Sequence, residues 1–399
     1  MLKAIKIRIY PNQPMREFFS RQFGACRWVY NHGLALRTET WLKEKKSVSR
    51  SALSKMLTDA KKKKETAWLA DVNAQALQQS LRHLEVAYQK FWKKEAQFPK
   101  FKKRGNHQSF TVPQNFNIEG GKLRLPKCEP IRMQRKVQIA LPIQKVTISM
   151  TPTGRYFASF LVEAPQPKIL KKTDKVIGVD LGLTSFLVTS DGKKVESPKF
   201  LKRSSRRLRL RQRSLSRRAK GSRGRERQRI FVARSHERVS DQRQDFLHKL
   251  STQLIRENQA IAVESLNVKG MMKNHHLAKA ISDQGWGQFL SMLRYKADWY
   301  GRTILVVDRF FPSSKRCFAC GWINENLSLN IRSWKCPSCL TAHDRDINAA
   351  KNILNCALSA TTAGMAESHA VGDRRSQRSR KVSSAGRRTR KPPTLVVGE

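Results

Sequence analysis

The chain has 399 residues, enough for roughly two to four domains, and its 80 Lys and Arg against 30 Asp and Glu give a formal net charge of +50. Its hydrophobic content of 39% excludes full disorder, and no apolar run approaches the ~18 residues that a membrane span needs. Because so much positive charge repels itself unless an anion neutralises it, we expect a nucleic acid as partner and no membrane. A ribosomal-type protein or a solvated basic surface is the alternative.

Residues 1–10 alternate polar and apolar side chains as a strand does, and they lack the apolar core of a signal peptide. The chain has seven cysteines, an odd number, which is typical of a reducing compartment. We therefore expect a cytoplasmic, nucleoid-associated protein.

Two amphipathic helices are predicted next. The first follows Asn12, and its apolar face holds Met15, Phe19, Phe23, Cys26 and Tyr30. The second follows Asn73, and its apolar face holds Leu77, Leu81, Leu84, Tyr88 and Phe91. The lysines at 61–64 indicate either a solvated turn or a phosphate contact.

From residue 107 the apolar period changes to two, with hairpin signals at Gly120-Gly121 and Thr153-Gly154. This pattern predicts a small antiparallel β domain over 107–166, which the opening strand joins. Residues 11–106 would then be a helical insertion in that domain.

A third region begins near residue 173. Residues 176–180 read as a buried strand that ends in Asp180, with 185–189 as its hairpin partner. Residues 202–243 hold 17 Lys or Arg against three acids. A basic helical arm on phosphates, with Arg206, Arg207, Arg217 and Arg218 as candidate contacts, competes here with a disordered linker.

The C-terminal part supplies two more acids. Residues 260–264 predict a buried strand that ends in Glu264, 281–300 an aromatic-rich helix and 303–307 a further strand. A last helix is expected over 346–358, opening at Asp346. Residues 357–399 are rich in Arg, Ser and Gly, and we predict a disordered basic tail there.

Asp180, Glu264 and Asp346 are the candidate catalytic residues. Carboxylates that converge at strand ends repel one another unless a cation joins them, and hard oxygen ligands suit Mg²⁺. Two such ions about 3.5–4 Å apart would support phosphodiester hydrolysis. A lone strand-end Asp is alternatively a turn residue, the Val-Asp-Leu-Gly stretch also occurs in actin-like ATPases, and Asp344 competes with Asp346.

Cys317, Cys320, Cys336 and Cys339 form two Cys-x2-Cys pairs separated by a fifteen-residue loop. This spacing predicts a structural Zn²⁺ site with four thiolate ligands, and disulfides are the alternative. The closed site would brace the segment that delivers Asp346, because metal binding couples to folding.

An ordered set of short motifs resembles the TnpB family, the RNA-guided DNA endonucleases encoded by bacterial insertion sequences and related to type V CRISPR nucleases. Over residues 1–356 these motifs are YPN at 10–12, RWVYN at 27–31, FPKF at 98–101, IGVDLG at 177–182, QDFLHKL at 244–250, VESL at 263–266, SDQGWG at 282–287, FPSS at 311–314, the cysteine quartet and DRDINAA at 344–350.

The resemblance implies a multidomain α+β protein. A RuvC/RNase H-like α/β nuclease domain would span 173–313 and 341–356, with the basic arm at 202–243 and a zinc-ribbon insert at 314–340. A wedge β-barrel over 1–10 and 107–166 would carry the helical recognition domain at 11–106. The family's catalytic acids map onto Asp180, Glu264 and Asp346.

It also implies partners. The transposon's right-end transcript would serve as guide RNA, and the protein would read a short transposon-adjacent motif beside double-stranded target DNA, with no obligate protein partner. Residues 68–81 resemble the recognition segment, so Gln78 is either a base reader or a solvent-facing residue. Ala74 is too short to reach a base. A catalytically silent repressor and a metal-dependent transposase are the rival functions.

Overall fold

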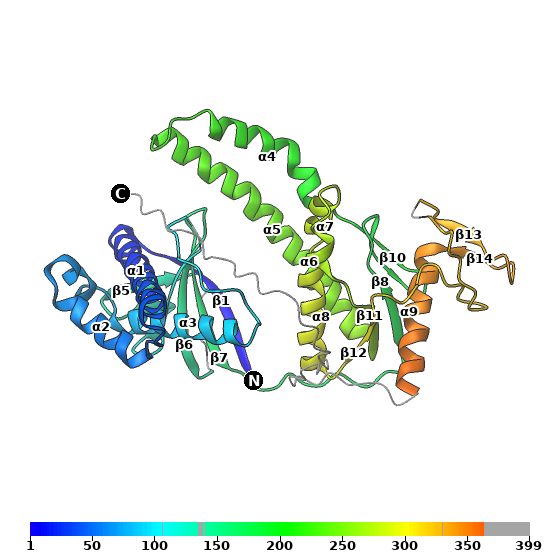
Figure 1. Ribbon diagram of the computed structural model, residues 1–399, viewed down its shortest axis with the longest axis horizontal. Helices are drawn as coiled ribbons and strands as arrows, with labels where there is room; N and C mark the ends of the chain where they lie inside the picture. Colours follow the sequence, from blue (N-terminus) through cyan, green and yellow to red (C-terminus); the bar gives the residue numbers. More distant parts are fainter. Residues whose placement is uncertain (106, 135–138, 140, 329, 363–399) are drawn as a thin grey trace.

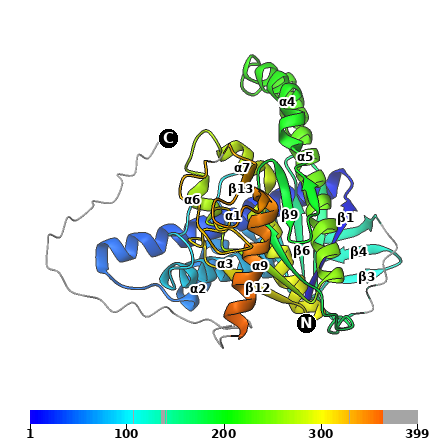
Figure 2. The ribbon, with the colours of Figure 1, turned by 90° about the vertical axis from the view of Figure 1, so that its right-hand side faces the viewer.

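The computed structural model describes residues 1–362 except 106, 135–138, 140 and 329. Figures 1 and 2 show a sheet with helices near the N-terminus, a second sheet with its own helices toward the C-terminus, and a long helical hairpin that projects beyond both. In the described part of the chain, no helix is both long and apolar enough to cross a membrane. The mixed α+β class predicted from the sequence is confirmed.

Within the described residues, the first sheet has seven strands in the order β2-β6-β7-β1-β5-β4-β3. All neighbours run antiparallel, and β1 pairs with β7 from Leu2↔Glu163 to Ile9↔Tyr156. Gly120, Gly121 and Gly154 have positive φ, which the two predicted hairpin turns require. The strands are β1 (Leu2–Tyr10), β2 (Gln108–Val112), β3 (Asn117–Glu119), β4 (Lys122–Leu125), β5 (Cys128–Met133), β6 (Ile143–Met150) and β7 (Tyr156–Glu163).

Three helices lie between β1 and β2 in the sequence: α1 (Gln13–Glu44), α2 (Arg50–Lys62) and α3 (Ala74–Trp92), with a 3-10 helix η1 (Lys64–Ala70). Asn12 and Asn73 cap α1 and α3 through side-chain oxygens. The predicted apolar faces are buried, except that Phe91 is 36% exposed. Helix α2 was not predicted, although Leu53, Leu57 and Ala60 line its buried face at helical spacing. The lysines at 61–64 form the last two residues of α2, its C-cap and the first residue of η1.

The second sheet has the order β10-β9-β8-β11-β12. Its strands are β8 (Val176–Asp180), β9 (Ser185–Thr189), β10 (Lys194–Glu196), β11 (Ala260–Glu264) and β12 (Thr303–Val307). Strands β8, β11 and β12 are parallel, whereas β9 and β10 are antiparallel to their neighbours.

Helices cover this sheet on both faces. Ile177, Val179 and Val263 pack with leucines of α5 (Arg223–Glu257) and with α8 (Trp286–Tyr300). On the other face, Ala262 packs with Ile353 and Ala357 of α9 (Arg345–Thr362). A Cβ added at Gly178 would lie only 2.1 Å from the Ala350 carbonyl oxygen, so only glycine allows α9 to approach β8 this closely.

The basic segment 202–243 is helical, and a disordered linker is excluded. It lies in α4 (Phe200–Ser216) and the first part of α5, which form the projecting hairpin of Figures 1 and 2. Leu208 and Val239 are buried in it. Arg225 Nη1 donates to the carbonyls of Leu215 and Arg218 at 2.8 and 2.9 Å, which fixes the tip.

Two predicted boundaries are wrong. The helix expected over 281–300 is broken into α7 (Ala278–Gln284) and α8, because Gly285 adopts a left-handed conformation with φ of 73°. Residues 357–362, which were expected to belong to the tail, are part of α9, and Ala357 is buried against the sheet. The rest of the predicted tail, 363–399, lies outside the described residues. A short helix α6 (Val268–Met271) precedes α7.

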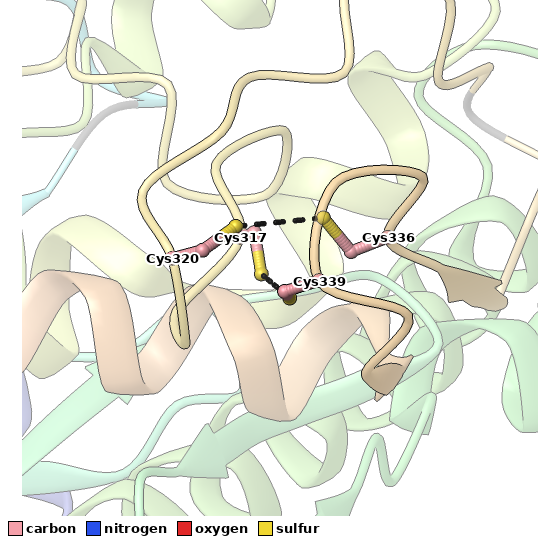
Figure 3. Close-up of side chains that lie close together, drawn as sticks. All are labelled: Cys317, Cys320, Cys336 and Cys339. Atoms are coloured by element: carbon pink, nitrogen blue, oxygen red, sulfur yellow. Dashed lines mark hydrogen bonds between the residues drawn. The ribbon is translucent and has the colours of Figure 1, made fainter.

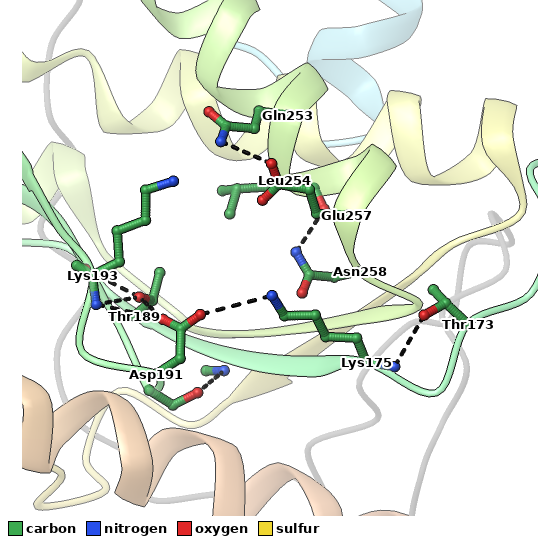
Figure 4. A network of polar contacts seen from close by, with 11 residues as sticks. Thr173, Lys175, Thr189, Asp191, Lys193, Gln253, Leu254, Glu257 and Asn258 are labelled. Carbon is green, nitrogen blue, oxygen red and sulfur yellow. Dashed lines mark hydrogen bonds and ion pairs between the residues drawn. The ribbon is translucent and has the colours of Figure 1, made fainter.

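A polar network closes the end of β8 opposite Asp180 (Figure 4). The Lys175 Nζ lies 3.8 Å from the Asp191 carboxylate, and the Thr189 hydroxyl donates to the same carboxylate. The Thr189 hydroxyl also accepts a 3.1 Å hydrogen bond from the Lys193 amide. Lys175 and Asp191 therefore neutralise each other at this end of the sheet.

Candidate active site and zinc centre

The predicted acids Asp180 and Glu264 are the last residues of two neighbouring parallel strands. The β8–β11 register pairs Val179 with Val263, so the next step along both strands brings Asp180 level with Glu264. Both side chains are half-buried. Apolar residues precede each acid because those strands are covered on both faces, and the acids stand where the cover ends.

The third acid, Asp346, reaches the same region on α9. It is the second residue of that helix, which packs across β8 through the close approach at Gly178. The charge of Asp346 is near enough to raise the pKa of Asp180. Segments separated by more than 80 residues in the sequence thus bring their carboxylates into one electrostatic environment.

Burial and neighbouring negative charges oppose the ionisation of Asp180 and Glu264. Burial, and then the charge of Asp346, raises the pKa of Asp180 to about 6. Burial, and then the charges of Asp180 and Asp308, raises the pKa of Glu264 to about 7. Such shifts indicate carboxylates that a bound cation would relieve, and they cluster at functional sites.

Asp308 is an acid that the sequence reading missed. It directly follows β12, whose Val307 pairs with Glu264, so it belongs to the same edge of the sheet. Its carboxylate also accepts a 2.8 Å hydrogen bond from the Phe310 amide. The sequence signal was available, because Asp308 closes an apolar strand as Asp180 and Glu264 do.

Asp344 and Asp346 have different surroundings. Asp344 accepts hydrogen bonds from the amides of Asp346 and Ile347, both at 3.1 Å, and pairs with Lys194 at 2.5 Å. Although burial opposes its ionisation, these bonds lower the pKa of Asp344. Asp344 therefore caps α9, and Asp346 is the residue whose charge acts on Asp180.

Arg332 is a second group that the sequence reading missed. Its guanidinium lies 3.5 Å from the Asp346 carboxylate and donates to the Thr184 hydroxyl at 3.2 Å. Asp346 follows Arg332 by fourteen positions, and Cys336 and Cys339 lie between them, so no local pattern revealed the pair. The arginine places a fixed positive charge at the edge of the acidic site.

The four predicted cysteines come together. Their sulfurs lie within 4.8 Å of one another; among the described residues no other set of three or more His, Cys, Asp or Glu ligand atoms lies this close together, and the set of Asp180, Glu264 and Asp346 does not. Figure 3 shows Cys317 beside Cys339 and Cys320 beside Cys336, with Sγ–Sγ distances of 3.6 Å for both pairs. Tetrahedral Zn–S bonds of about 2.3 Å place sulfurs about 3.8 Å apart, so the quartet fits a structural zinc site.

His343 is a neighbour of this quartet that the spacing did not reveal. Its Nε2 lies 3.0 Å from the Cys317 Sγ. A ring N–H in that position stabilises a thiolate, as groups behind metal ligands commonly do. His343 lies on β14 (Ala342–Asp344), which connects the second cysteine pair to α9. Strand β14 pairs with β13 (Ser333–Lys335), which precedes that cysteine pair.

Two buried asparagines link the loop that carries Cys317 to the helix that carries Asp346. Asn348 donates to the Arg316 carbonyl at 2.7 Å and accepts from the Phe318 amide at 3.0 Å. Asn352, one turn later, donates to the carbonyls of Ser313 and Arg316 at 2.8 and 2.6 Å. The position of Asp346 is thereby coupled to the fold of the cysteine loops.

The candidate nucleic-acid contacts lie far apart in the fold. Gln78 is exposed on α3, and its amide oxygen accepts a 3.1 Å hydrogen bond from Ser54 of α2. Arg206 and Arg207 are exposed on α4, and Arg217 and Arg218 are exposed at the hairpin tip. Within the described residues, none of these four arginines has an acidic partner within salt-bridge distance.

Three family models match the chain. "Probable transposase" matches residues 159–275, "Cas12f1-like, TNB domain" matches 286–353 and "Helix-turn-helix domain" matches 1–46. The last match covers β1 and the single long helix α1 in this structure. The second spans the cysteine quartet and Asp346.

Comparison with known proteins gives relatives over nearly the whole length. A "Putative RNA-guided DNA endonuclease" of Streptomyces pristinaespiralis is 43% identical, over 91% of each chain. The "Putative RNA-guided DNA endonuclease InsQ" of Escherichia coli K12 is 30% identical, over 88% of this chain and 92% of the relative.

Among solved structures, that titled "Cryo-EM structure of the Cas12f1-sgRNA-target DNA complex" has a similar fold. It matches 89% of this chain and 99% of its own, with a TM-score of 0.56 at 13% identity. With the curated relatives and the family models, this likeness agrees with the motifs quoted above. The chain therefore belongs to the TnpB (IS605 OrfB) family.

Proposed function

We propose that the chain is an RNA-guided, Mg²⁺-dependent endonuclease that hydrolyses double-stranded DNA. The observation that carries the proposal is that the β8–β11 register sets Asp180 level with Glu264, while the charge of Asp346 opposes the ionisation of Asp180 and the charge of Asp180 opposes that of Glu264. The names of the curated relatives support the same reaction class. In this proposal the single carboxylate site cuts the two DNA strands one after the other.

Asp180, Glu264 and Asp346 would hold the magnesium ions. Bound there, Mg²⁺ supplies polarisation of the scissile phosphate and a lowered pKa of the attacking water. Because the pKa values of Asp180 and Glu264 are raised, a cation bound beside them would lower both pKa values and stabilise the ionised carboxylates. Arg332 holds the Asp346 carboxylate in place and lies where it can contact a phosphate.

The zinc-binding quartet has a structural role in this proposal. Four thiolates leave no open coordination position. The hydrogen bonds of Asn348 and Asn352 fix α9 against the loop that carries Cys317. We place the zinc insert at 314–340, within a RuvC-like domain over 173–313 and 341–356. The wedge barrel comprises 1–10 and 107–166, and the recognition insert 11–106.

The proposed guide is RNA from the right end of the transposon, and the α4–α5 arm binds it through phosphates. The protein reads a short transposon-adjacent motif, with Gln78 on α3 as a candidate reader. These reactions take place in the cytoplasm. No obligate protein partner is part of the proposal.

The test uses the purified protein–RNA complex, matched DNA and Mg²⁺. Asp180→Ala, Glu264→Ala and Asp346→Ala should each abolish cutting while guide-dependent binding remains. Asp245→Ala is the control, because that exposed acid pairs with Lys249 on the surface of α5. Cutting that survives all three substitutions refutes the site, and binding without cutting by the parent chain identifies a repressor.

A metal-dependent transposase is the second candidate, favoured by the description of the family model over 159–275. It would join or cut transposon ends without RNA. RNase treatment of the complex separates the two, because it should abolish the activity of a guided nuclease and leave that of a transposase.

A further inference from the structure

The motifs RWVYN and FPKF, which the proposed reaction does not use, meet at one pocket of about 710 Å³. It is an open concavity on α1, bordered by Trp68 of η1 and by Phe101. Its volume falls in the range of roughly 300–1,000 Å³ that is typical of sites for small molecules. Phe101, which lies 57 residues after the end of α1 in the sequence (101 − 44), thus completes a concave surface on that helix.

The pocket wall is fixed by specific contacts. Asn31 donates to the Lys102 carbonyl at 2.9 Å and accepts from the Lys102 amide at 2.8 Å. The Lys102 ammonium lies 4.0 Å from the centroid of the Tyr30 ring. These contacts hold Phe101 against α1, so the pocket is a built feature of the fold.

Four of the ten lining residues carry aromatic rings. Trp28 and His32 stack with centroids 4.5 Å apart and an interplanar angle of 13°, and Trp68 meets Trp28 edge-on at 6.2 Å. Trp68 is 40% exposed and Phe101 is 47% exposed. Exposed rings at this density form a platform on which a planar, unpaired base can stack.

Charged groups on the lining identify the ligand further. Arg21 and Arg27 suit phosphates, and Arg27 is oriented by a 3.0 Å hydrogen bond to Gln108. Asp71 repels phosphate but accepts hydrogen bonds from hydroxyl or amino groups. A ribose 2′-hydroxyl is such a donor, and DNA lacks it.

We propose that this pocket binds one unpaired nucleotide of RNA, with its base stacked on the exposed ring of Trp68 and edge-on to Trp28. Its phosphate faces the arginines, and its 2′-hydroxyl faces Asp71. The inference rests on the proposed function for the presence of RNA in the complex. It adds a site that senses a bulged or looped nucleotide, separate from the phosphate contacts of the α4–α5 arm.

The test compares two RNA hairpins that differ by a single bulged 2-aminopurine. The full-length protein should quench the 2-aminopurine emission, because stacking quenches that base. Trp68→Ala should weaken binding of the bulged hairpin by about 5- to 150-fold and leave the paired hairpin unchanged. Trp68→Phe should restore most of the affinity. Trp41→Ala is the matched control, since Trp41 is a 55% exposed residue of α1 outside the pocket.

Equal losses for both hairpins, or an equal loss in Trp41→Ala, would overturn the site. Unchanged zinc content and circular dichroism must accompany the loss in Trp68→Ala, and the Trp68→Phe variant decides if they do not. A bulged DNA hairpin that binds as tightly as the RNA would overturn the assignment to RNA. Cleavage is not measured, so the pocket stands or falls independently of the endonuclease proposal.

Discussion

The close contact between β8 and α9 makes Gly178→Ala the sharpest test of how the fold positions the site. The new Cβ would lie 2.1 Å from the Ala350 carbonyl oxygen and 2.8 Å from the Leu354 Cβ. Ordinary contact begins near 3.4 Å, so α9 must retreat by about 1.3 Å. Overpacking of this kind costs about 1–3 kcal/mol, which lowers Tm by roughly 2–12 °C.

Because Asp346 is on the first turn of α9, the same displacement should reduce cutting. A shift of about 1 Å in a catalytic group costs on the order of 100-fold in rate. We expect this loss in single-turnover cleavage of matched DNA by the guide-loaded complex. Gly287→Ala is the control, since nothing lies within 4 Å of its added Cβ in α8. A Gly178→Ala protein with the parent's Tm and cleavage rate would refute the packing argument.

Three further predictions concern charge and metal. The pKa of Glu264 is raised from 4.5 to about 7, so ionisation of this carboxyl costs the native state free energy that builds up as the pH rises from about 4.5 to 7. Glu264→Gln should therefore stabilise the magnesium-free protein at pH 8 by about 1–2 kcal/mol and give no advantage at pH 4. Equal urea midpoints of the two proteins at pH 8 would contradict this. Cys336→Ser should lose zinc, by metal analysis, and most of the soluble yield, whereas Cys128→Ser, outside the quartet, should keep both. Arg206→Ala combined with Arg217→Ala should lower the slope of log affinity for RNA against log salt by about 2, and an unchanged slope would remove the arm from the interface.

Features governed by local pattern could be predicted from the sequence. The apolar runs that end in Asp180 and Glu264 mark two strands correctly, because parallel strands covered on both faces need continuous apolar sequence. Asn12 and Asn73 mark two helix starts, since each side chain caps orphan amides. The cysteine spacing also identifies the quartet, because each Cys-x2-Cys pair lies on one tight turn and is therefore set by local sequence.

Features that depend on tertiary partners could not be predicted in this way. The break at Gly285 follows from one left-handed residue inside an otherwise helical pattern. Arg332 and Asp346 meet only once the cysteine-bearing loops fold back on themselves. Asn348 was noted as part of a motif, but its bonds to the cysteine-bearing loops need the α9 packing that Gly178 permits.

The central place of β1 in its sheet has a consequence for synthesis. Residues 2–9 pair with 156–163, which lie about 150 residues later in the chain. At about 5–20 residues per second, some 150 residues must be translated first, so β1 waits roughly 8–30 s for its partner. A nascent chain stalled before residue 156 should therefore expose β1 to protease, and one stalled well beyond 164 should protect it.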